Sequence, residues 1–470
     1  MFYLIGRFFI GVLPGILCVV LTYFFGKKII SKRSSSYAAT IMAVSYLNVV
    51  NSHYIYTDML LVAFIVFFYI RLLCLYKQPS CANYIAAGCL LGLATGTKYN
   101  GLFLLVPLLI THLAVLKSCD RKTGYHPGYK SIGWSVVAAV IAFMILNPFA
   151  FIDYKGFLDS SLSQTGAFTY TGWSHHMVYS LFEGVSMPIT LIGVVGLIFF
   201  ARKGVAGVIL LSFPCVFYLV LVFKSQHFPR YVLPLIPFLS IGCAYFIFDV
   251  LYKKLRFKWM RIILAGISVT VLLSTLGKSV KADMLLAGDD TRVKSAEWIM
   301  ANIPEGTAIA CDSTTFRPAL KQPYSQLVLK KAFLSRQEAL GKLKEKKLML
   351  EIEASDKKNK GYPVYFLYEV PEEQGQFLDT IPALAYDLGV IKAAGIEYVS
   401  VNMQDLDSNK KAFLDVLGSV AEPIKSFSPY VSGEYEENKD PIASTCLPVR
   451  ANELYSRKQK GPYLRLYRIK

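Results

Sequence analysis

The stretch N-V-V-N-S-H-Y-I-Y-T-D-M-L-L-V-A, residues 48–63, joins two long apolar segments and carries a histidine and a carboxylate at the junction. His53 and Asp58 are five residues apart, where the chain leaves the first segment and enters the second. A carboxylate at the centre of a bilayer costs roughly 2.5 to 3.5 kcal/mol. We therefore expect this pair to lie at a face of a membrane and not in its interior.

The composition favours a membrane protein. Hydrophobic residues make up 54% of the 470 residues and charged residues 17%, whereas ordinary soluble domains have about 45 to 50% and about 25%. Only six of the 32 acidic residues precede residue 278. This asymmetry predicts a multi-spanning transmembrane domain over residues 1–277 and a water-facing domain over residues 278–470.

Ten apolar segments are expected to form the transmembrane domain. They lie near residues 2–25, 37–52, 59–76, 83–97, 101–116, 131–150, 181–201, 204–223, 231–250 and 262–276. Several are shorter than the roughly 20 residues that a straight spanning helix needs, so the helices are expected to extend beyond them. The predicted fold class is an α-helical multi-pass membrane protein.

The net charge of +18 does not point to nucleic acid, because of where the charges lie. Residues 1–277 carry 22 Lys and Arg against six acidic residues, and residues 278–470 carry 28 against 26. A basic excess confined to short loops between apolar segments is the positive-inside pattern of membrane topology. We therefore expect membrane lipids as partners and no nucleic acid.

The basic residues fall mainly on alternate loops. Seventeen lie at residues 27–33, 71–77, 117–130, 202–203 and 253–261, and five on the other side, at Arg7, Lys98, Lys155, Lys224 and Arg230. The richer side is expected to face the cytoplasm, so residues 278–470 would lie outside the cytoplasmic membrane. The N-terminus would also lie outside, and since the first segment is no cleavable signal peptide, we expect a further helix upstream of Met1.

The same topology gathers ionisable and aromatic side chains at the outer face. They are His53, Asp58, Lys98, Tyr99, Asp153, Asp159, His175, His176, Glu183, His227 and Arg230. Such a cluster offers cations for a phosphate and carboxylates for proton transfer or metal binding. The alternative is that loops simply hold polar residues.

Two outer stretches carry more information than isolated charges. In G-L-A-T-G-T-K-Y-N-G, residues 92–101, small residues break the helix around Lys98, and freed backbone N–H groups beside a lysine suit a lipid phosphate. In H-F-P-R-Y-V-L-P-L-I-P, residues 227–237, Arg230 can bind a phosphate through two parallel hydrogen bonds. The alternatives are a tight turn with a snorkelling lysine and an interfacial aromatic anchor.

Cysteine and motif patterns exclude several soluble chemistries. Seven of the nine cysteines lie in or beside apolar segments, and only Cys311 and Cys446 fall in the exterior domain, where a disulfide between them stays open. C-x-x-C, H-E-x-x-H, phosphate-loop and dinucleotide-binding motifs are all missing. Zinc, nucleotide and dinucleotide sites of the soluble types are therefore not expected.

The water-facing part alternates helical and strand patterns. Residues 291–306 predict an amphipathic helix with Val293, Ala296, Ile299 and Met300 on one side, ending before Pro304. Strands are expected at residues 307–311, 363–368, 398–402 and 463–469, with a helix near Leu388. This order predicts a small α/β domain. The lysine-rich run at residues 330–360 is expected to be a solvated helix and loop.

Several of these stretches, in this order, resemble one family. They are L-I-G-R-F-F-I-G-V-L-P-G (4–15), Y-F-F-G-K-K (23–28), S-H-Y-I-Y-T-D-M-L-L (52–61), the two stretches around Lys98 and Arg230, A-E-W-I-M-A-N-I-P-E-G (296–306) and A-G-I-E-Y-V-S-V (394–401). The chain resembles the multi-spanning glycosyltransferases of the GT-C type, in the branch of protein O-mannosyltransferases and lipid A aminoarabinose transferases. The resemblance is fairly specific over residues 1–310 and holds only in outline beyond them.

The resemblance implies transfer of a sugar from a polyprenyl-phosphate carrier to a lipid, glycan or protein acceptor at the outer face. Asp58 and His53 would orient the acceptor or a metal, Lys98 and Arg230 would contact the phosphate, and Tyr99 and Tyr231 would line the carrier. In the family the catalytic base is an acidic residue on a loop after a first helix. This chain resembles the family from the second helix onward, so we expect its base to be missing and transfer by the chain as given to be undetectable. Dependence on a divalent metal stays open.

Two other classes remain as alternatives. A transporter or flippase of lipid-linked sugars would place ionisable residues near the bilayer midplane and often show two related halves, whereas here the polar groups are predicted at one face. A non-catalytic membrane assembly subunit would use the exterior domain for contacts. Loss of transfer on substitution of Asp58, Lys98 and Arg230 would separate an enzyme from both.

Overall fold

The computed structural model describes residues 2–118, 128–163, 173–223, 228–312, 317–328, 360–367, 384–404, 406, 408–434 and 453–470. The chain forms two compact units. Among the described residues, the helical unit extends to Asp283 and the C-terminal unit begins at Met284. The boundary predicted at residue 277 and the one found at Asp283 both fall within helix α15, Lys258–Ala287.

The helical unit is built almost entirely of apolar helices. In chain order they are α1 (Phe2–Arg7), η1 (Phe8–Val12), α2 (Leu13–Ile29), α3 (Lys32–Val44), α4 (Tyr46–Ser52), α5 (Asp58–Lys77), α6 (Cys81–Thr97), η2 (Tyr99–Leu104), α7 (Leu105–Ser118), α8 (Tyr129–Leu146), α9 (Phe149–Ile152), α10 (Tyr154–Ser163), η3 (His176–Ser186), α11 (Met187–Ala201), α12 (Val205–Val222), η4 (Pro229–Leu235), α13 (Ile236–Ala244), η5 (Tyr245–Leu251), α14 (Tyr252–Lys254) and α15. Among the described residues, eight continuous helices are long and apolar enough to cross a membrane, and α6 is a shorter apolar helix. The predicted multi-pass helical fold is confirmed.

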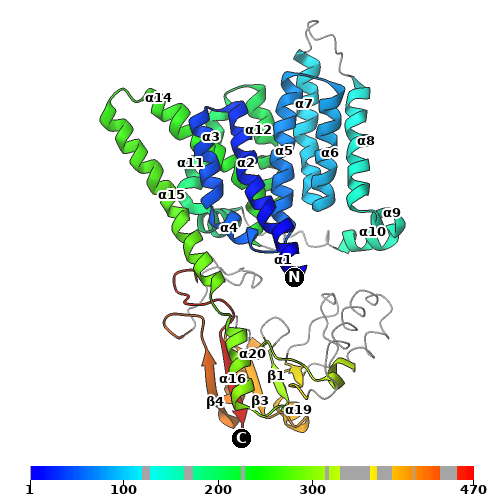
Figure 1. Ribbon diagram of the computed structural model, residues 1–470, viewed down its shortest axis with the longest axis vertical. Helices are drawn as coiled ribbons and strands as arrows, with labels where there is room; N and C mark the ends of the chain where they lie inside the picture. The colour runs from blue at the N-terminus through cyan, green and yellow to red at the C-terminus, as the bar shows by residue number, and fades with distance from the viewer. Residues whose placement is uncertain are drawn as a thin grey trace. The chain divides into compact units, whose positions relative to one another are not determined.

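One predicted span is divided. The apolar segment at residues 37–52 forms two helices, α3 and α4, because Ser45 between them is extended, with φ −66° and ψ 123°. Asn48 at the start of α4 donates from Nδ2 to the Met42 carbonyl oxygen (3.0 Å), which supplies a partner to a carbonyl at the end of α3. As a result α4 stays at one end of the unit, close to the beginning of α5 (Figure 1).

Glycines bring α6 and α8 into direct backbone contact. A Cβ atom at Gly88 would lie 2.1 Å from the Ser135 carbonyl oxygen, and one at Gly92 would lie 2.1 Å from the Ala139 carbonyl oxygen. Close approach through small residues is how membrane helices gain packing contacts where no hydrophobic driving force acts between them. At the end of this contact Asn147 donates from Nδ2 to the Gly96 carbonyl oxygen (2.9 Å), just before α6 ends.

The C-terminal unit is the predicted α/β domain. Its strands are β1 (Ile309–Cys311), β2 (Val364–Phe366), β3 (Tyr398–Asn402), β4 (Ala421–Phe427) and β5 (Leu464–Ile469), and its main helices are α16 (Thr291–Asn302), α19 (Leu388–Ala393) and α20 (Ser408–Val420). The sheet order is β2-β1-β3-β5-β4, with β1 parallel to β2 and β3, and β5 antiparallel to β3 and β4. The four predicted strands are confirmed to within about two residues, whereas α20 and β4 were not predicted.

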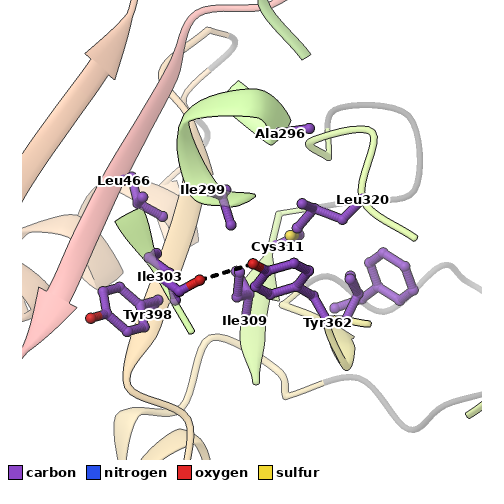
Figure 2. Close-up of a cluster of buried hydrophobic side chains, with 11 residues drawn as sticks. Ala296, Ile299, Ile303, Ile309, Cys311, Leu320, Tyr362, Tyr398 and Leu466 are labelled. Atoms are coloured by element: carbon purple, nitrogen blue, oxygen red, sulfur yellow. Dashed lines mark hydrogen bonds between the residues drawn. The ribbon is translucent and has the colours of Figure 1, made fainter. Parts of the chain in front are cut away.

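Both faces of this sheet are covered. Ile309 and Cys311 of β1 pack with Ala296, Ile299 and Ile303 on one face, where the Tyr362 hydroxyl donates to the Ile303 carbonyl oxygen (2.9 Å; Figure 2). On the other face, side chains of α19 and α20 pack against β1, β3 and β5. Every residue of β1 and β3 is buried, as expected for strands of a sheet that is covered on both faces.

The prediction of the buried face of α16 is right for two of its four residues and wrong for the other two. Ala296 and Ile299 are buried in the core as predicted, but Val293 and Met300 are 43% and 53% exposed. The four predicted residues cover too wide an arc of the helix to be buried together. The third apolar residue that packs in the core is Ile303, which directly follows the last residue of α16. The predicted lysine-rich run lies mostly outside the described residues.

A buried ion pair lies at the carboxyl ends of β1 and β3. Asp312, which directly follows β1, pairs through Oδ2 with Lys410 Nζ of α20, and both side chains are about 5% exposed. The same carboxylate accepts from the Asn402 backbone N–H (3.2 Å) and from the Tyr386 hydroxyl (2.7 Å). Tyr386 has a positive φ of 56°, which is uncommon for a non-glycine residue and aims its ring at this pair.

Candidate active site

Three segments of the helical unit converge on one carboxylate. Asp58 is the first residue of α5, Lys98 directly follows α6 in an extended conformation, and Arg230 is the second residue of η4. The Nζ atom of Lys98 lies 2.5 Å from Oδ1 of Asp58, and Nε of Arg230 lies 3.7 Å from Oδ2. The sequence predicted all three residues as site residues, and the structure brings them together as one group, the Asp58 cluster.

Burial within the Asp58 cluster is uneven. The Asp58 side chain is 6% exposed, whereas the side chains of Lys98 and Arg230 are 25% and 16% exposed. One carboxylate therefore faces two cations, and the cations are the more accessible partners. Such a cluster has a surplus of one positive charge and suits an anion that approaches from the exposed side.

Aromatic rings hold both cations in place. Lys98 Nζ lies 4.9 Å from the centre of the Tyr231 ring, and the Arg230 guanidinium lies 4.5 Å from the Tyr56 ring and 4.4 Å from the Phe228 ring. Contacts of this kind attract a cation to the face of an aromatic ring. The sequence analysis missed Tyr56 and Phe228, although each stands two residues before a predicted charged residue.

The two tyrosines predicted to line a lipid carrier differ in exposure. Tyr231 is buried and forms the platform under Lys98. Tyr99 is 46% exposed, and its ring lies edge to face with Phe157 of α10 at 6.1 Å. Of the pair, Tyr99 presents the more accessible ring, so it is the one that can contact a long apolar ligand.

His53 belongs to a different group. Arg7 donates from its guanidinium to His53 Nδ1 (2.9 Å), and His53 Nε2 lies 2.9 Å from Oδ1 of Asp283 near the end of α15. The His53 ring therefore links α1 to α15. Asp58 instead pairs with Lys98 and Arg230, so the two predicted residues do not act as one pair. Asp283 was missed because it lies beyond the predicted domain boundary at residue 277.

The remaining outer-face residues form smaller local contacts. Lys278 Nζ donates to the Glu183 carbonyl oxygen (2.7 Å) and lies 3.4 Å from its carboxylate. His175 and His176 are buried at the start of η3, and Asp153 accepts from the Gly156 backbone N–H (3.2 Å). Asp159 is exposed, and Lys224 and His227 lie outside the described residues. The predicted single cluster is thus divided into several groups.

Helix positions show that these groups share one end of the helical unit. The beginning of α5, the helices α4, α9 and α10, and the later part of α15 lie at that end, whereas α14 and the beginning of α15 lie at the opposite end (Figure 1). Among the described residues, His, Cys, Asp and Glu side chains form no group of three or more that could hold a metal ion.

A comparison with protein families identifies the helical unit. Residues 3–160, which contain Asp58 and Lys98, match the model of the family described as dolichyl-phosphate-mannose-protein mannosyltransferase. The resemblance drawn from the sequence motifs is confirmed over these residues. A search of curated proteins returned no match.

Solved structures match this chain at low sequence identity. ArnT from Cupriavidus metallidurans in the apo state has 11% sequence identity and a TM-score of 0.48, with 88% of this chain and 80% of that chain covered. The same protein bound to undecaprenyl phosphate has 12% identity and a TM-score of 0.44, with 89% and 82% covered. The archaeal oligosaccharyltransferase AglB from Archaeoglobus fulgidus, in complex with an inhibitory peptide and a dolichol-phosphate, has 12% identity and a TM-score of 0.40, with 92% and 63% covered.

Proposed function

We propose that this protein is a GT-C glycosyltransferase that takes its sugar from a polyprenyl-phosphate donor and transfers it to a lipid, glycan or protein acceptor at the outer face of the cytoplasmic membrane. The observation that carries the donor class is the pairing of Lys98 and Arg230 around the buried Asp58, with the two cations more exposed than the carboxylate. The match to a family described by a dolichyl-phosphate sugar supports the same donor class.

In this reaction the bond between the anomeric carbon and a phosphate oxygen breaks, and the acceptor oxygen bonds to the carbon. The leaving group is a lipid phosphate whose negative charge grows as the bond breaks. Lys98 and Arg230 would stabilise that charge, because donors that are already in position need no reorganisation during the reaction. The acceptor oxygen loses its proton to water as the new bond forms.

Asp58 would act on the two cations and not on the acceptor. Both of its carboxylate oxygens face a cation, so it holds Lys98 and Arg230 at a fixed separation and offsets part of their repulsion. Tyr56 and Phe228 would orient the guanidinium, and the exposed ring of Tyr99 would contact the first isoprene units of the carrier.

The proposed orientation of the helical unit in the membrane rests on the charges of its loops. The end of the helical unit that carries the Asp58 cluster is poor in Lys and Arg, and the opposite end is rich in them, which favours an outer position for the cluster. Reporter fusions after Ser279 test this proposal. An extracytoplasmic reporter is expected, and a cytoplasmic one would remove the outer-face assignment.

Binding of the carrier tests the donor class. The full chain, in nanodiscs of zwitterionic lipid, is titrated with undecaprenyl phosphate and compared with Lys98→Ala and Arg230→Ala. Each substitution is expected to weaken binding at least about tenfold, since a charge-assisted contact to phosphate is lost. Lys278→Ala, a cation at the same end paired with Glu183, is the matched control and should bind normally. Equal binding by all four proteins would overturn the assignment.

A further inference from the structure

A second cationic group lies at the opposite end of the helical unit, where α14 turns into α15 (Figure 1). The guanidinium of Arg33, in the first turn of α3, lies 5.0 Å from the centre of the Tyr252 ring. The guanidinium of Arg261, in α15, lies 5.1 Å from the centre of the same ring. Three segments that are far apart in the sequence thus place two arginines on one tyrosine.

Hydrogen bonds hold these segments in place. Asp249 Oδ2 accepts from the Ser31 backbone N–H (3.1 Å) and from the Ser34 hydroxyl (2.7 Å), which ties the start of α3 to η5. Arg261 donates from Nε to the Leu255 carbonyl oxygen (3.1 Å), which directs its guanidinium toward the turn. The separation of the two guanidinium groups is therefore set by the packing of α3, η5 and α15.

The positive charge of this group is not neutralised within the described residues. Neither Arg33 nor Arg261 has a carboxylate partner there, and Asp249 is already paired with Lys253 (2.8 Å). Further exposed cations stand close by in the sequence, at Lys254, Arg256 and Lys258. Two arginines that lie against the same hydroxyl-bearing ring, neither with a carboxylate partner among the described residues, can bind a phosphate through several hydrogen bonds.

Exposed aromatic residues indicate where the bound anion would come from. Phe257 and Trp259 are 61% and 59% exposed, and their rings stack at 6.4 Å between the cations of this turn. Aromatic rings at the end of a spanning helix lie at the level of lipid headgroups. The adjacent cations are then at the depth of lipid phosphates, and not far out in the aqueous phase where a soluble anion would be met.

We propose that Arg33, Tyr252 and Arg261 form a binding site for the phosphate of an anionic phospholipid, in the leaflet at this end of the helical unit. The site is separate from the Asp58 cluster, and it does not depend on the donor class proposed above. Basic pockets between transmembrane helices are a recognised way of binding acidic headgroups. Here the two guanidinium groups supply the charge, and Phe257 and Trp259 contact the acyl chains.

Native mass spectrometry of the full chain tests the proposal. The protein is titrated with phosphatidylglycerol or phosphatidylcholine, and the number and affinity of retained lipids are compared between the wild type and Arg33→Gln with Arg261→Gln. We expect phosphatidylglycerol binding to weaken at least fivefold in the double variant and phosphatidylcholine binding to stay unchanged. The matched control is Arg202→Gln with Lys203→Gln, which removes two cations that also stack on aromatic rings at this end. It is expected to change binding less than twofold.

Three results would overturn the proposal. The first is an equal loss in both double variants, which would mean diffuse attraction by the whole basic surface. The second is an unchanged affinity in the first double variant. The third is displacement of phosphatidylglycerol by millimolar glycerol phosphate, which would indicate a site for soluble anions. Arg33→Lys with Arg261→Lys keeps the charge and the fold but loses the planar fork, so this variant is expected to weaken binding more than twofold.

Discussion

Asp58 in the helical unit and Asp312 in the C-terminal unit are both buried carboxylates that hold a lysine, yet their surroundings differ. Asp312 faces one cation, Lys410, and its oxygens also accept from a backbone N–H and a tyrosine hydroxyl. Asp58 faces two cations and leaves both of them partly exposed. The first arrangement is closed and balanced in charge, whereas the second has a cationic surplus on its open side.

The difference separates a structural ion pair from a proposed binding site. Removing one partner of a closed pair leaves an uncompensated buried charge, so the cost falls on folding. In an open cluster with surplus charge, removal of a cation costs less in folding and more in the binding of an anion. Substitutions at the two carboxylates should therefore affect different measurements.

The largest effect is expected from Lys410→Met in the closed pair. Asp312 would remain buried without a cation, and the free energy of unfolding of the C-terminal unit should fall by about 3 to 5 kcal/mol. Burial raises the pKa of the Cys311 thiol to about 12, so this thiol reacts slowly until the unit opens. Mass spectrometric labelling of Cys311 in the full chain measures that opening.

Two variants control this experiment. Lys411→Met changes an exposed neighbour and should leave the labelling rate unchanged. Asp312→Leu combined with Lys410→Met removes both charges and should recover at least half of the lost stability, since buried pairs can be replaced by apolar residues. A wild-type rate in Lys410→Met itself would show that Asp312 and Lys410 are not a structural pair.

The next effect is expected in the open cluster. In a version of the protein that also carries the expected upstream helix and loop, Lys98→Ala and Arg230→Ala should each lower kcat/KM for sugar transfer more than tenfold, which is about 1.4 kcal/mol or more of transition-state stabilisation. Folding and membrane insertion should be retained, as judged by thermal unfolding in nanodiscs, with Lys278→Ala as the control. Near-normal turnover in both variants would leave the two cations as packing residues.

Asp58→Asn tests whether Asp58 positions Lys98 and Arg230 or contacts the donor directly. Without the carboxylate, Lys98 and Arg230 keep their charges but lose their spacing, so kcat should fall about tenfold while donor affinity changes less than about threefold. Separate measurements of donor binding and single-turnover transfer give this split. A large loss of affinity with normal kcat would contradict the positioning role.

The smallest effect is expected at Asp290, a third carboxylate with intermediate burial at the start of α16. Burial opposes its ionisation, but hydrogen bonds from the Arg292 side chain and backbone outweigh burial and hold the pKa of Asp290 below its ordinary value. Its stabilising contribution is therefore present above the unfolded pKa of about 3.9 and is lost as the pH falls through the lower folded value. Asp290→Asn keeps a good helix-capping residue but removes the charge that faces Arg292, so it should reduce stability by about 0.5 to 1 kcal/mol at pH 7.

Hydrogen exchange of the α16 amides in the full chain, corrected for the intrinsic rate, measures this contribution. The difference between the wild type and Asp290→Asn should shrink as the pH is lowered from 7 toward 3. Asp289→Asn changes an adjacent exposed carboxylate and should have almost no effect. A difference that grows at low pH would have the wrong sign for a depressed pKa.

The sequence was most informative where local patterns decide structure. Because Lys and Arg fall mainly on every second loop, the sequence predicted which ends of the helices lie together. This prediction placed Asp58, Lys98 and Arg230 at the same end of the helical unit. Their contact could not be predicted, because it joins residues 58, 98 and 230 through helix packing that no local pattern encodes.

Long-range pairing was also the main source of error. His53 pairs with Asp283 across 230 residues of sequence, so its proximity to Asp58 along the chain was a poor guide to its partners. The helix α20 and strand β4 follow each other directly at Val420 and Ala421, without the turn residues that usually signal a boundary. Similarly, Val293 and Met300 had helical spacing but lie outside the packed face.

The contact between α6 and α8 affects how activity screens of this enzyme should be read. Gly88 and Gly92 lie outside the Asp58 cluster, yet a side chain at either position would push the two backbones apart. The hydrogen bond from Asn147 to the Gly96 carbonyl oxygen, two residues before Lys98, would then break. A screen would score such glycine variants as inactive, although the chemical groups of the site are intact. Restoring activity would need a compensating change on the facing surface of α8, at Ser135 or Ala139, and not a change in the site itself.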